Sequence, residues 1–314
     1  MEPLFLNPAY KDYVWGGNKL RFKFHKTTDL DKLAECWEIS ANKNGKSVIR
    51  NGEHSGKTLD ELFKDISLRI SIFGNSTIDM EEFPILIKYI DAEKNLSIQV
   101  HPDDEYAKMY ENCSGKAEVW HIMDCEEDSK IICGINLKGK SIRDIITSDN
   151  IEDYFNYINV KKGDTIFISP GTIHAIMGGI QICEIQQNSD ITYRLYDWNR
   201  LGNDGKPREL HIDKAIDVIK SNNEINVIHD SSELGAKTVI KDRRFNVDRI
   251  NVDGLFSDST NDSSFYAYNV LSGDGLLIIY EKTYQLIPGE SFIIPAQKCN
   301  YEIKGKLKLL KTYM

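Results

Sequence analysis

The stretch Ser97-Ile98-Gln99-Val100-His101-Pro102-Asp103-Asp104 constrains the fold of this chain more than any other. It is typical of a β-strand that ends at a proline turn, and side chains in a strand alternate between its two faces. Ile98 and Val100 therefore face one way, and Gln99 and His101 face the other. An amide beside an imidazole packs poorly in an apolar core, but both groups can bind a metal ion. The stretch predicts a sheet that carries part of a metal site.

Two later strand-like segments supply further donors for such a site. Lys116–Trp120 carries Glu118, and Ser169–His174 ends at His174. With Gln99 and His101 these make two imidazoles, one carboxylate and one amide oxygen, a set that suits a borderline divalent ion such as zinc. A water or substrate oxygen completes the shell, and manganese, iron or cobalt also fits. We expect the remaining histidines to be hydrogen-bonded core or surface residues: His25, His54, His121, His211 and His229.

Two lysines have an ambiguous position relative to this site. Lys116 precedes Glu118 by two residues, so both side chains lie on one face of a strand. Lys116 belongs either to the site or to a surface ion pair with a neighbouring strand. Lys88 interrupts the apolar run Phe83–Asp91, which predicts a strand buried on both faces. Lys88 either extends to solvent from an edge strand or points toward the site.

Further charged residues follow His174 in the chain. Glu184 and Gln186 alternate together along the strand-like run 180–187, and Asp190 and Arg194 bracket the next strand. A planar guanidinium suits a phosphate or a developing oxyanion better than an ammonium does. The alternative for Arg194 is a structural salt bridge with a nearby carboxylate.

The rest of the chain favours β structure with helical insertions. There are 15 Tyr and 12 Phe but only 8 Pro, and many short runs are rich in Ile and Val. Apolar residues at helical spacing over 141–158 predict an insertion of two helices that breaks near Ser148-Asp149-Asn150. The remaining helices are predicted over three segments: 58–63 with a Thr58/Glu61 capping box, 103–112 and 211–219.

A short internal repeat indicates two related barrels. Val160–Pro170 and Leu286–Pro295 each contain a Gly-acid turn, an apolar strand and a proline. Four residues past the proline, the first copy has His174 and the second has Cys299, so the second barrel lacks that ligand. The segment 221–237 is polar and is predicted to be a linker or an exposed loop, with short strands from Thr238 on. We therefore expect a catalytic domain over 1–225 and a smaller barrel over 226–314.

Charge and cysteine usage restrict the partners and the compartment. A net charge of −9 and a pI near 5.4 argue against nucleic-acid binding, although a local cationic cluster can still hold a small phosphorylated substrate. No apolar run approaches the roughly 20 residues needed to cross a bilayer, so no membrane partner is expected. The N-terminus lacks the features of a signal peptide. The 6 cysteines form no CxxC pair and mostly lie in apolar runs, which favours buried free thiols in a cytoplasmic protein.

Several of these motifs together resemble the type I phosphomannose isomerases in their short bacterial form. The resemblance is carried by Gln99–Asp104, Gly115–Trp120, Pro170–Ala175 and Gln186–Asp197, with earlier matches at Trp15-Gly16-Gly17 and Trp37–Ser40. It implies a cupin fold (jelly-roll barrels with the metal site in the first) and an aldose–ketose isomerase that interconverts mannose 6-phosphate and fructose 6-phosphate. Because the motifs lie between about residue 10 and residue 210, the C-terminal barrel is covered only in outline.

The resemblance also implies roles for individual residues. Gln99, His101, Glu118 and His174 correspond to the family's ligands for one zinc ion (Zn2+) per chain, and Arg194 corresponds to its catalytic arginine. Lys116 and Asp190 correspond to family positions that line the pocket, and we expect Glu184, Lys88 and Trp15 to line the substrate pocket as well. A monomer or weak homodimer is expected. The general base stays open among Glu184, Asp190, Lys116 and a metal-bound hydroxide, and ring opening would use Asp190 or Lys116.

Three other functions remain compatible with a barrel of this kind. One is a sugar-binding cupin without catalysis, and another is an isomerase of a related sugar phosphate. The third is an iron dioxygenase, which usually uses two histidines and one carboxylate. Gln99 as a fourth ligand and the cationic Lys116 and Arg194 argue against the dioxygenase.

Overall fold

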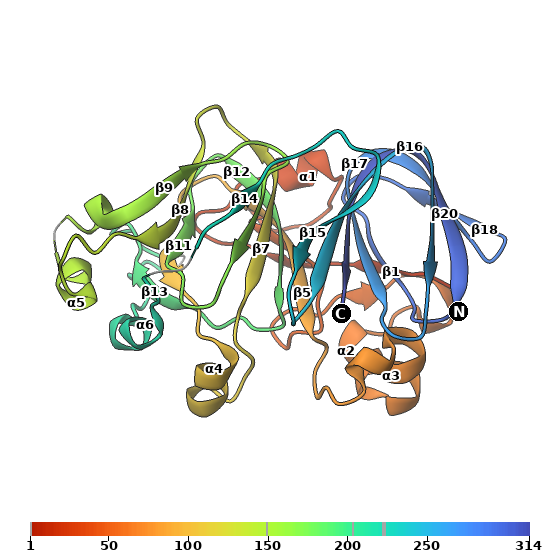
Figure 1. The fold of residues 1–314 in the computed structure, drawn as a ribbon, viewed down its shortest axis with the longest axis horizontal. Coiled ribbons are helices and arrows are strands. Elements are labelled where there is room, and N and C mark those ends of the chain that lie inside the picture. Colours follow the sequence, from red (N-terminus) through yellow and green to blue (C-terminus); the bar gives the residue numbers. More distant parts are fainter. Residues whose placement is uncertain (1, 149, 203, 222–223) are drawn as a thin grey trace.

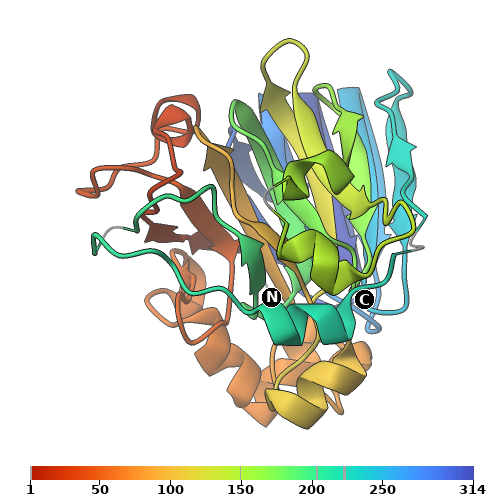
Figure 2. The ribbon, with the colours of Figure 1, turned by 90° about the vertical axis from the view of Figure 1, so that its left-hand side faces the viewer.

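The computed structural model describes residues 2–148, 150–202, 204–221 and 224–314. Two β lobes lie side by side, and most of the helices gather at one end and along one flank (Figure 1). From the left-hand side, in Figure 2, the first lobe stands in front of the second, and most of the helices lie at the lower end. The predicted fold class, mainly β with helical insertions, is confirmed.

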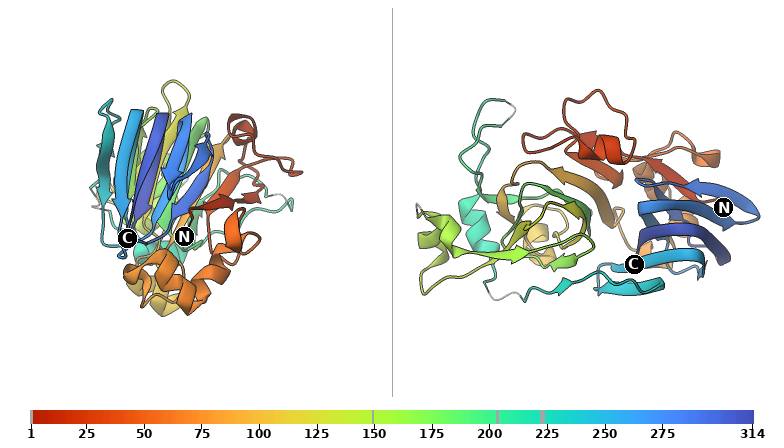
Figure 3. Two further views of the ribbon diagram at one scale, coloured as in Figure 1. Left: turned by 90° about the vertical axis from the view of Figure 1, so that its right-hand side faces the viewer. Right: turned by 90° about the horizontal axis from the view of Figure 1, so that it is seen from above.

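The first lobe consists of a seven-stranded and a five-stranded antiparallel sheet. In spatial order the larger sheet contains β14 (Val227–Ile228), β10 (Thr165–Ile168), β7 (Glu118–Cys125), β12 (Ile180–Gln187), β5 (Ile85–Ala92), β3 (Glu35–Ile39) and β2 (Ala9–Lys11). The smaller contains β13 (Tyr193–Tyr196), β6 (Ile98–Val100), β11 (His174–Ile176), β8 (Lys130–Ile135) and β9 (Phe155–Asn159). Side chains from both sheets, including Ile90, Trp120 and Ile131, form one buried core between them. The lobe is therefore a barrel, visible end-on in the right panel of Figure 3.

The second lobe is built on an eight-stranded sheet. Its order is β15 (Gly235–Lys241), β16 (Asn246–Thr260), β20 (Cys299–Tyr313), β17 (Tyr266–Ile279), β19 (Ser291–Ile294), β1 (Leu4–Asn7) and β4 (Val48–Ile49), with β18 (Lys282–Leu286) on β17. The prediction of short strands here holds for β18 and β19 but is wrong for β16 and β20, which each span 15 residues and pair along their whole length. The N-terminal strand β1 pairs with β19. The division of the chain at residue 225 stays a prediction.

The helices are short and lie in the connections between strands. They are α1 (Lys19–Lys23), α2 (Leu59–Lys64), α3 (Ile66–Phe73), α4 (Asp104–Tyr110), α5 (Ile142–Ile146) and α6 (Ile212–Val218), with 3-10 turns at Gly52–His54, Asn75–Thr77 and Ile151–Tyr154. The predicted capping box of α2 is confirmed: Glu61 N–H donates to Thr58 Oγ1 at 3.2 Å, and Thr58 N–H donates to Glu61 Oε2 at 2.7 Å. Both contacts satisfy donors at the helix start.

Two sequence predictions fail in the connecting segments. The helical insertion ends at Tyr154, and Phe155–Asn159 forms β9 on β8, since edge pairing outweighs the helical spacing of these few residues. The predicted helix break includes Asp149, which lies outside the described residues. The predicted linker 221–237 contains β14, which pairs with β10, and the first residues of β15. Its residues 222–223 lie outside the described part.

Cysteine burial and the internal repeat follow the predictions in part. Cys36, Cys133 and Cys183 are buried, whereas Cys113 is exposed and Cys125 and Cys299 are half-buried, so only half of the thiols behave as expected. All six are free. The two repeat segments do occupy equivalent places: each has a glycine with positive φ, Gly163 at 91° and Gly289 at 87°, two residues before β10 and β19 respectively.

Candidate metal centre and cavity

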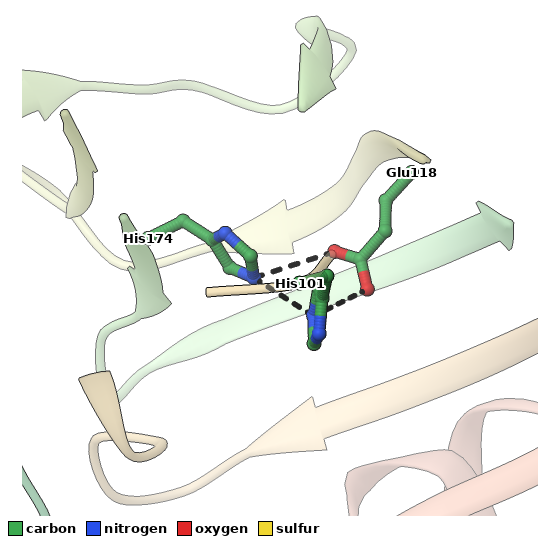
Figure 4. Close-up of side chains that lie close together, drawn as sticks. All are labelled: His101, Glu118 and His174. Atoms are coloured by element: carbon green, nitrogen blue, oxygen red, sulfur yellow. Dashed lines mark hydrogen bonds and ion pairs between the residues drawn. The ribbon is translucent and has the colours of Figure 1, made fainter. Parts of the chain in front are cut away.

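His101, Glu118 and His174 converge in the first barrel (Figure 4). The Nε2 atoms of the two histidines are 3.2 Å apart, and Glu118 places Oε1 at 3.1 Å from His101 Nε2 and Oε2 at 3.6 Å from His174 Nε2. Glu118 begins β7 of the larger sheet, whereas His174 begins β11 and His101 follows β6 in the smaller one. The three side chains thus meet between the two sheets, and all are at most 1% exposed.

The spacing of these donor atoms fits a tetrahedral metal site. Ligand atoms about 2.0–2.1 Å from a zinc ion lie roughly 3.3 Å from one another in a tetrahedron, close to the distances observed here. Thr172 O accepts a hydrogen bond from His174 Nδ1 at 2.8 Å, which leaves the lone pair of that imidazole on Nε2. Burial, with the charge of Lys116, lowers the pKa of His101 to about 3, and burial lowers the pKa of His174. Both imidazoles are therefore neutral at pH 7, as metal ligands must be.

Glu118 is charged in spite of its burial. Desolvation disfavours the ionised carboxylate, but Lys116 and His101 outweigh that cost and hold its pKa well below the usual range. Lys116 Nζ lies 2.9 Å from Glu118 Oε1 and 3.3 Å from His101 Nε2, and the lysine is 4% exposed. The alternative of a surface ion pair for Lys116 is therefore wrong, because its partner is a buried member of the candidate metal cluster.

Gln99 lies beside the cluster, with its amide nitrogen rather than its amide oxygen facing His174. It pairs in register with His174 on one side and with Arg194 on the other. Its Nε2 is 3.5 Å from His174 Nε2, and its Oε1 accepts a hydrogen bond from Ser97 at 3.3 Å. A half-turn of the amide exchanges these two atoms and directs the oxygen toward the cluster. The role of Gln99 as a ligand stays a prediction.

A cavity of about 330 Å³ adjoins the candidate metal cluster. All of the other predicted site residues line it: Trp15, Lys88, Gln99, Lys116, Glu184, Asp190 and Arg194. They come from β5, β6, β12 and β13, from the segments before β7 and β13, and from the connection after β2, so neither sheet forms the cavity alone. Since Gln99 and Lys116 contact both the cavity and the cluster, a ligand in the cavity would lie next to the metal site.

Lys88 lies in the middle of a sheet, so the edge-strand alternative for it is wrong. β5 has β12 on one side and β3 on the other, and Lys88 pairs with Glu184 and Trp37 on those strands. Its Nζ is 3.0 Å from Glu184 Oε1 and 3.9 Å from Glu35 Oε2. These ion pairs turn the lysine toward the cavity and leave it 6% exposed.

Glu184 is connected to the metal cluster through an indole. The Trp120 Nε1–H lies 3.0 Å from Glu118 Oε2 and 3.0 Å from Glu184 Oε2, so the two buried carboxylates share one donor. Burial and the charge of Glu118 raise the pKa of Glu184, and Lys88 opposes that rise. A buried carboxylate with a raised pKa at a cavity wall has the properties of a general base.

Arg194 and Asp190 occupy the cavity wall contributed by β13 and the segment before it. Arg194 Nη1 donates to the Glu209 carbonyl at 2.8 Å, while its Nε is buried without a hydrogen-bond partner. Among the described residues no carboxylate lies within ion-pair distance of this guanidinium, so the salt-bridge alternative for Arg194 is wrong. Asp190 accepts a hydrogen bond from Asn44.

The cavity-lining residues that the sequence reasoning missed include Tyr13, Glu35, Trp37 and Arg208. Glu35 and Trp37 are two residues apart in β3, so their side chains lie on the same face of the strand. The alternation of Trp37-Glu38-Ile39-Ser40, extended two residues toward the N-terminus, would have indicated both. Tyr13 stacks on Trp15 with ring centroids 5.3 Å apart. No sequence pattern indicates Arg208, which follows a turn well beyond the last strand of the site.

The fold and the site together define a cupin-type barrel with a candidate metal centre at a polar cavity. The chain belongs to the type I phosphomannose isomerase family. The profile described as the catalytic domain of type I phosphomannose isomerase matches residues 4–118, and that of the mannose-6-phosphate isomerase cupin domain matches residues 236–314. The resemblance inferred from the motifs is thereby confirmed.

Similar proteins extend over the whole chain. Mannose-6-phosphate isomerase ManA of Bacillus subtilis is 36% identical over 100% of this chain and 99% of its own length, and mannose-6-phosphate isomerase of Streptococcus mutans is 35% identical over 99% and 98%. The crystal structure of the Bacillus subtilis mannose 6-phosphate isomerase superposes with a TM-score of 0.92 at 36% identity, covering 100% of both chains. A mannose 6-phosphate isomerase bound with zinc and yttrium shares the fold, with a TM-score of 0.77 at 16% identity over 100% of this chain and 99% of its own.

The helices of the described residues are all too short or too polar to cross a bilayer.

Proposed function

We propose that this chain interconverts mannose 6-phosphate and fructose 6-phosphate, with one zinc ion bound by His101, Glu118, His174 and Gln99. The observation that carries the proposal is the convergence of two neutral imidazoles and a carboxylate at tetrahedral spacing, next to a cavity lined by lysine and arginine side chains. The full-length relatives are named for this activity, and one protein of the same fold is described as bound with zinc.

The reaction moves a proton between C1 and C2 of the open-chain sugar. Its barrier is set largely by negative charge that develops on the oxygens of those carbons. A divalent ion in this donor set would act there as a Lewis acid. Arg194, which has no carboxylate partner among the described residues and pairs with Gln99, is proposed to place a second positive charge beside the same oxygens.

Glu184 is the best-supported general base for the proton at C2. It lines the cavity, and the donors Trp120 and Lys88 hold its carboxylate in place, each at 3.0 Å. Its pKa is raised by burial, which brings it closer to neutral pH and favours proton abstraction. Lys116 is instead ion-paired with Glu118, so it acts as a cation rather than as a base. Asp190, which also lines the cavity, is proposed to assist ring opening. The aromatic rings of Trp15 and Tyr13 are proposed to contact the apolar face of the sugar.

The family match and the full-length relatives support this reading over a sugar-binding protein without catalysis. The same matches oppose an iron dioxygenase. A second argument against it is that Lys116 and Arg194 place two cations at the cavity, where that chemistry needs open metal positions. Preference for a related sugar phosphate is decided by the assay below. We further propose that the protein is cytoplasmic, which its six free cysteines favour, and that it is a monomer or a weak homodimer.

A coupled assay of mannose 6-phosphate turnover, with and without a chelator, tests the proposal. We expect turnover to disappear on chelation and to return with zinc, and metal analysis should find one ion per chain. Full activity in metal-free protein would remove the metal from the mechanism. Substrate deuterated at C2 should lose label to water if Glu184 exchanges its proton. Complete retention of the label at C1 would contradict proton abstraction by a solvent-exchanging base.

A further inference from the structure

The cationic side chains of the cavity differ in how closely they are paired with carboxylates. Its cationic lining residues are Lys88, Lys116, Arg194 and Arg208. Lys88 lies between two carboxylates, 3.0 Å from Glu184 and 3.9 Å from Glu35. Lys116 is paired with Glu118 at 2.9 Å. Because each lysine faces at least one buried carboxylate, the lysine wall offers no surplus charge to a dianionic phosphate.

The arginine wall differs, because two guanidinium groups, those of Arg200 and Arg208, share the one carboxylate of Asp197, and Arg194 lies near them without an ion-pair partner among the described residues. Asp197 Oδ1 lies 2.7 Å from Arg200 Nη2 and 2.5 Å from Arg208 Nη2, and Arg208 Nε donates to Asp197 Oδ2 at 2.7 Å. Arg194 is close enough to both arginines for their charges to lower its pKa, after burial. Arg194 therefore differs from both lysines, because no carboxylate of the described residues lies within ion-pair distance of its guanidinium, whereas each lysine is paired.

The guanidinium of Arg208 is held in one orientation and still has a nitrogen that can bind a ligand in the cavity. Asp197, which is 6% exposed, takes the Nε and Nη2 edge of the guanidinium and fixes its plane. Nη1 has no partner among the described residues, and the side chain lines the cavity. A planar guanidinium held in this way matches the oxygens of a phosphate group and loses little rotational freedom on binding it.

We infer that Arg208, oriented by Asp197, binds the phosphate group of the substrate, while Arg194 acts at the sugar carbons. This inference rests on the proposed function. The order of residues along the strands supports it: Arg194 is opposite Gln99 and Tyr196 is opposite Ile98, so Asp197 follows in the direction that leads away from the metal cluster. Three residues of strand span roughly 10 Å, enough to separate the two ends of a six-carbon chain with bonds of about 1.5 Å.

The test measures steady-state kinetics with mannose 6-phosphate and competitive inhibition by inorganic phosphate. Arg208→Ala should raise KM and the phosphate inhibition constant together, by about 10- to 150-fold, the range for a lost hydrogen bond to a charged group. kcat should stay within about threefold, because Arg208 contacts only the non-reacting end. Arg208→Lys keeps the charge without the planar edge and should be intermediate. Arg200→Ala is the matched control, since Arg200 shares Asp197 but is not a lining residue.

An unchanged KM and an unchanged phosphate inhibition constant in Arg208→Ala would overturn the inference, as would a fall in kcat alone. If Arg208→Ala fails to fold, as judged by thermal unfolding, Arg208→Lys decides between the same outcomes. Failure of the proposed function has a different signature: the wild-type protein would not turn over mannose 6-phosphate. Calorimetric titration with inorganic phosphate would then still test Arg208, with weaker binding in Arg208→Ala supporting the phosphate site.

Discussion

Replacing Lys88 by methionine tests the buried charge arrangement of the cavity most directly. Lys88 Nζ is 3.0 Å from Glu184 Oε1, and at an effective dielectric constant of about 20 this pair interacts by about 5 kcal/mol. Part of that energy offsets the desolvation of the two groups, and removing one partner of a buried pair typically costs about 3–5 kcal/mol. For 314 residues, with about 2.1 cal/mol/K of unfolding entropy each, a loss of about 4 kcal/mol lowers Tm by about 6 °C.

The destabilisation of Lys88→Met depends on pH in a defined direction. The pKa of Glu184 is already raised by burial, and removal of Lys88 raises it further. The folded variant then keeps a proton on Glu184 that the unfolded chain releases near its ordinary pKa of about 4.3. The stability loss is therefore small below that pH and grows as the pH rises from there toward the new folded pKa. Because a protonated Glu184 cannot abstract a proton, the acid limb of kcat/KM also moves to higher pH.

Thermal unfolding followed by circular dichroism at pH 4 and pH 8, together with a pH profile of kcat/KM, measures both effects. Lys26→Met is the matched control, because Lys26 pairs with the buried Glu38 at 2.7 Å and does not line the cavity. It should lose stability without a shift of the pH profile. A Lys88→Met protein as stable as wild type at pH 8, with an unmoved profile, would refute the reasoning.

Three further substitutions test other parts of the structure. Arg194→Ala should lower kcat by at least about 10²-fold, the scale for removing one transition-state charge stabiliser, and a near-normal kcat would remove Arg194 from the mechanism. Gln99→Ala should weaken zinc binding by about 10- to 100-fold in a competition titration with a chromophoric chelator if the amide is a ligand or supports one; equal affinity would exclude both roles. Tyr301→Phe removes the hydroxyl that accepts from Tyr268 at 2.5 Å and donates to Asp258 at 2.9 Å in the second lobe. We expect a loss of about 1–3 kcal/mol in denaturant unfolding with unchanged kcat, and a change in kcat would show that the two lobes are coupled.

Much of the candidate site was predictable because its residues lie in short strands with recognisable ends. The alternation around Gln99 and His101, and the turn before His174, placed donors on one face of each strand. The family resemblance added the pairing of these segments into one site, which strand patterns do not contain. The residues that this reasoning missed, such as Arg208, come from a connection that has neither alternation nor helical spacing.

The sequence by itself determined the β class, the capping box of α2, and the strands that position His101, Glu118 and His174. These are local properties, because the direction of a side chain along a strand or the start of a helix depends on neighbouring residues. Only the tertiary structure decided that Lys88 lies in a central strand, that Lys116 is buried against Glu118, and that 155–159 is a strand. Those outcomes depend on which strands become neighbours and in what register. Contacts between residues far apart in the chain, such as Lys88 with Glu184, set that register, and no local pattern records it.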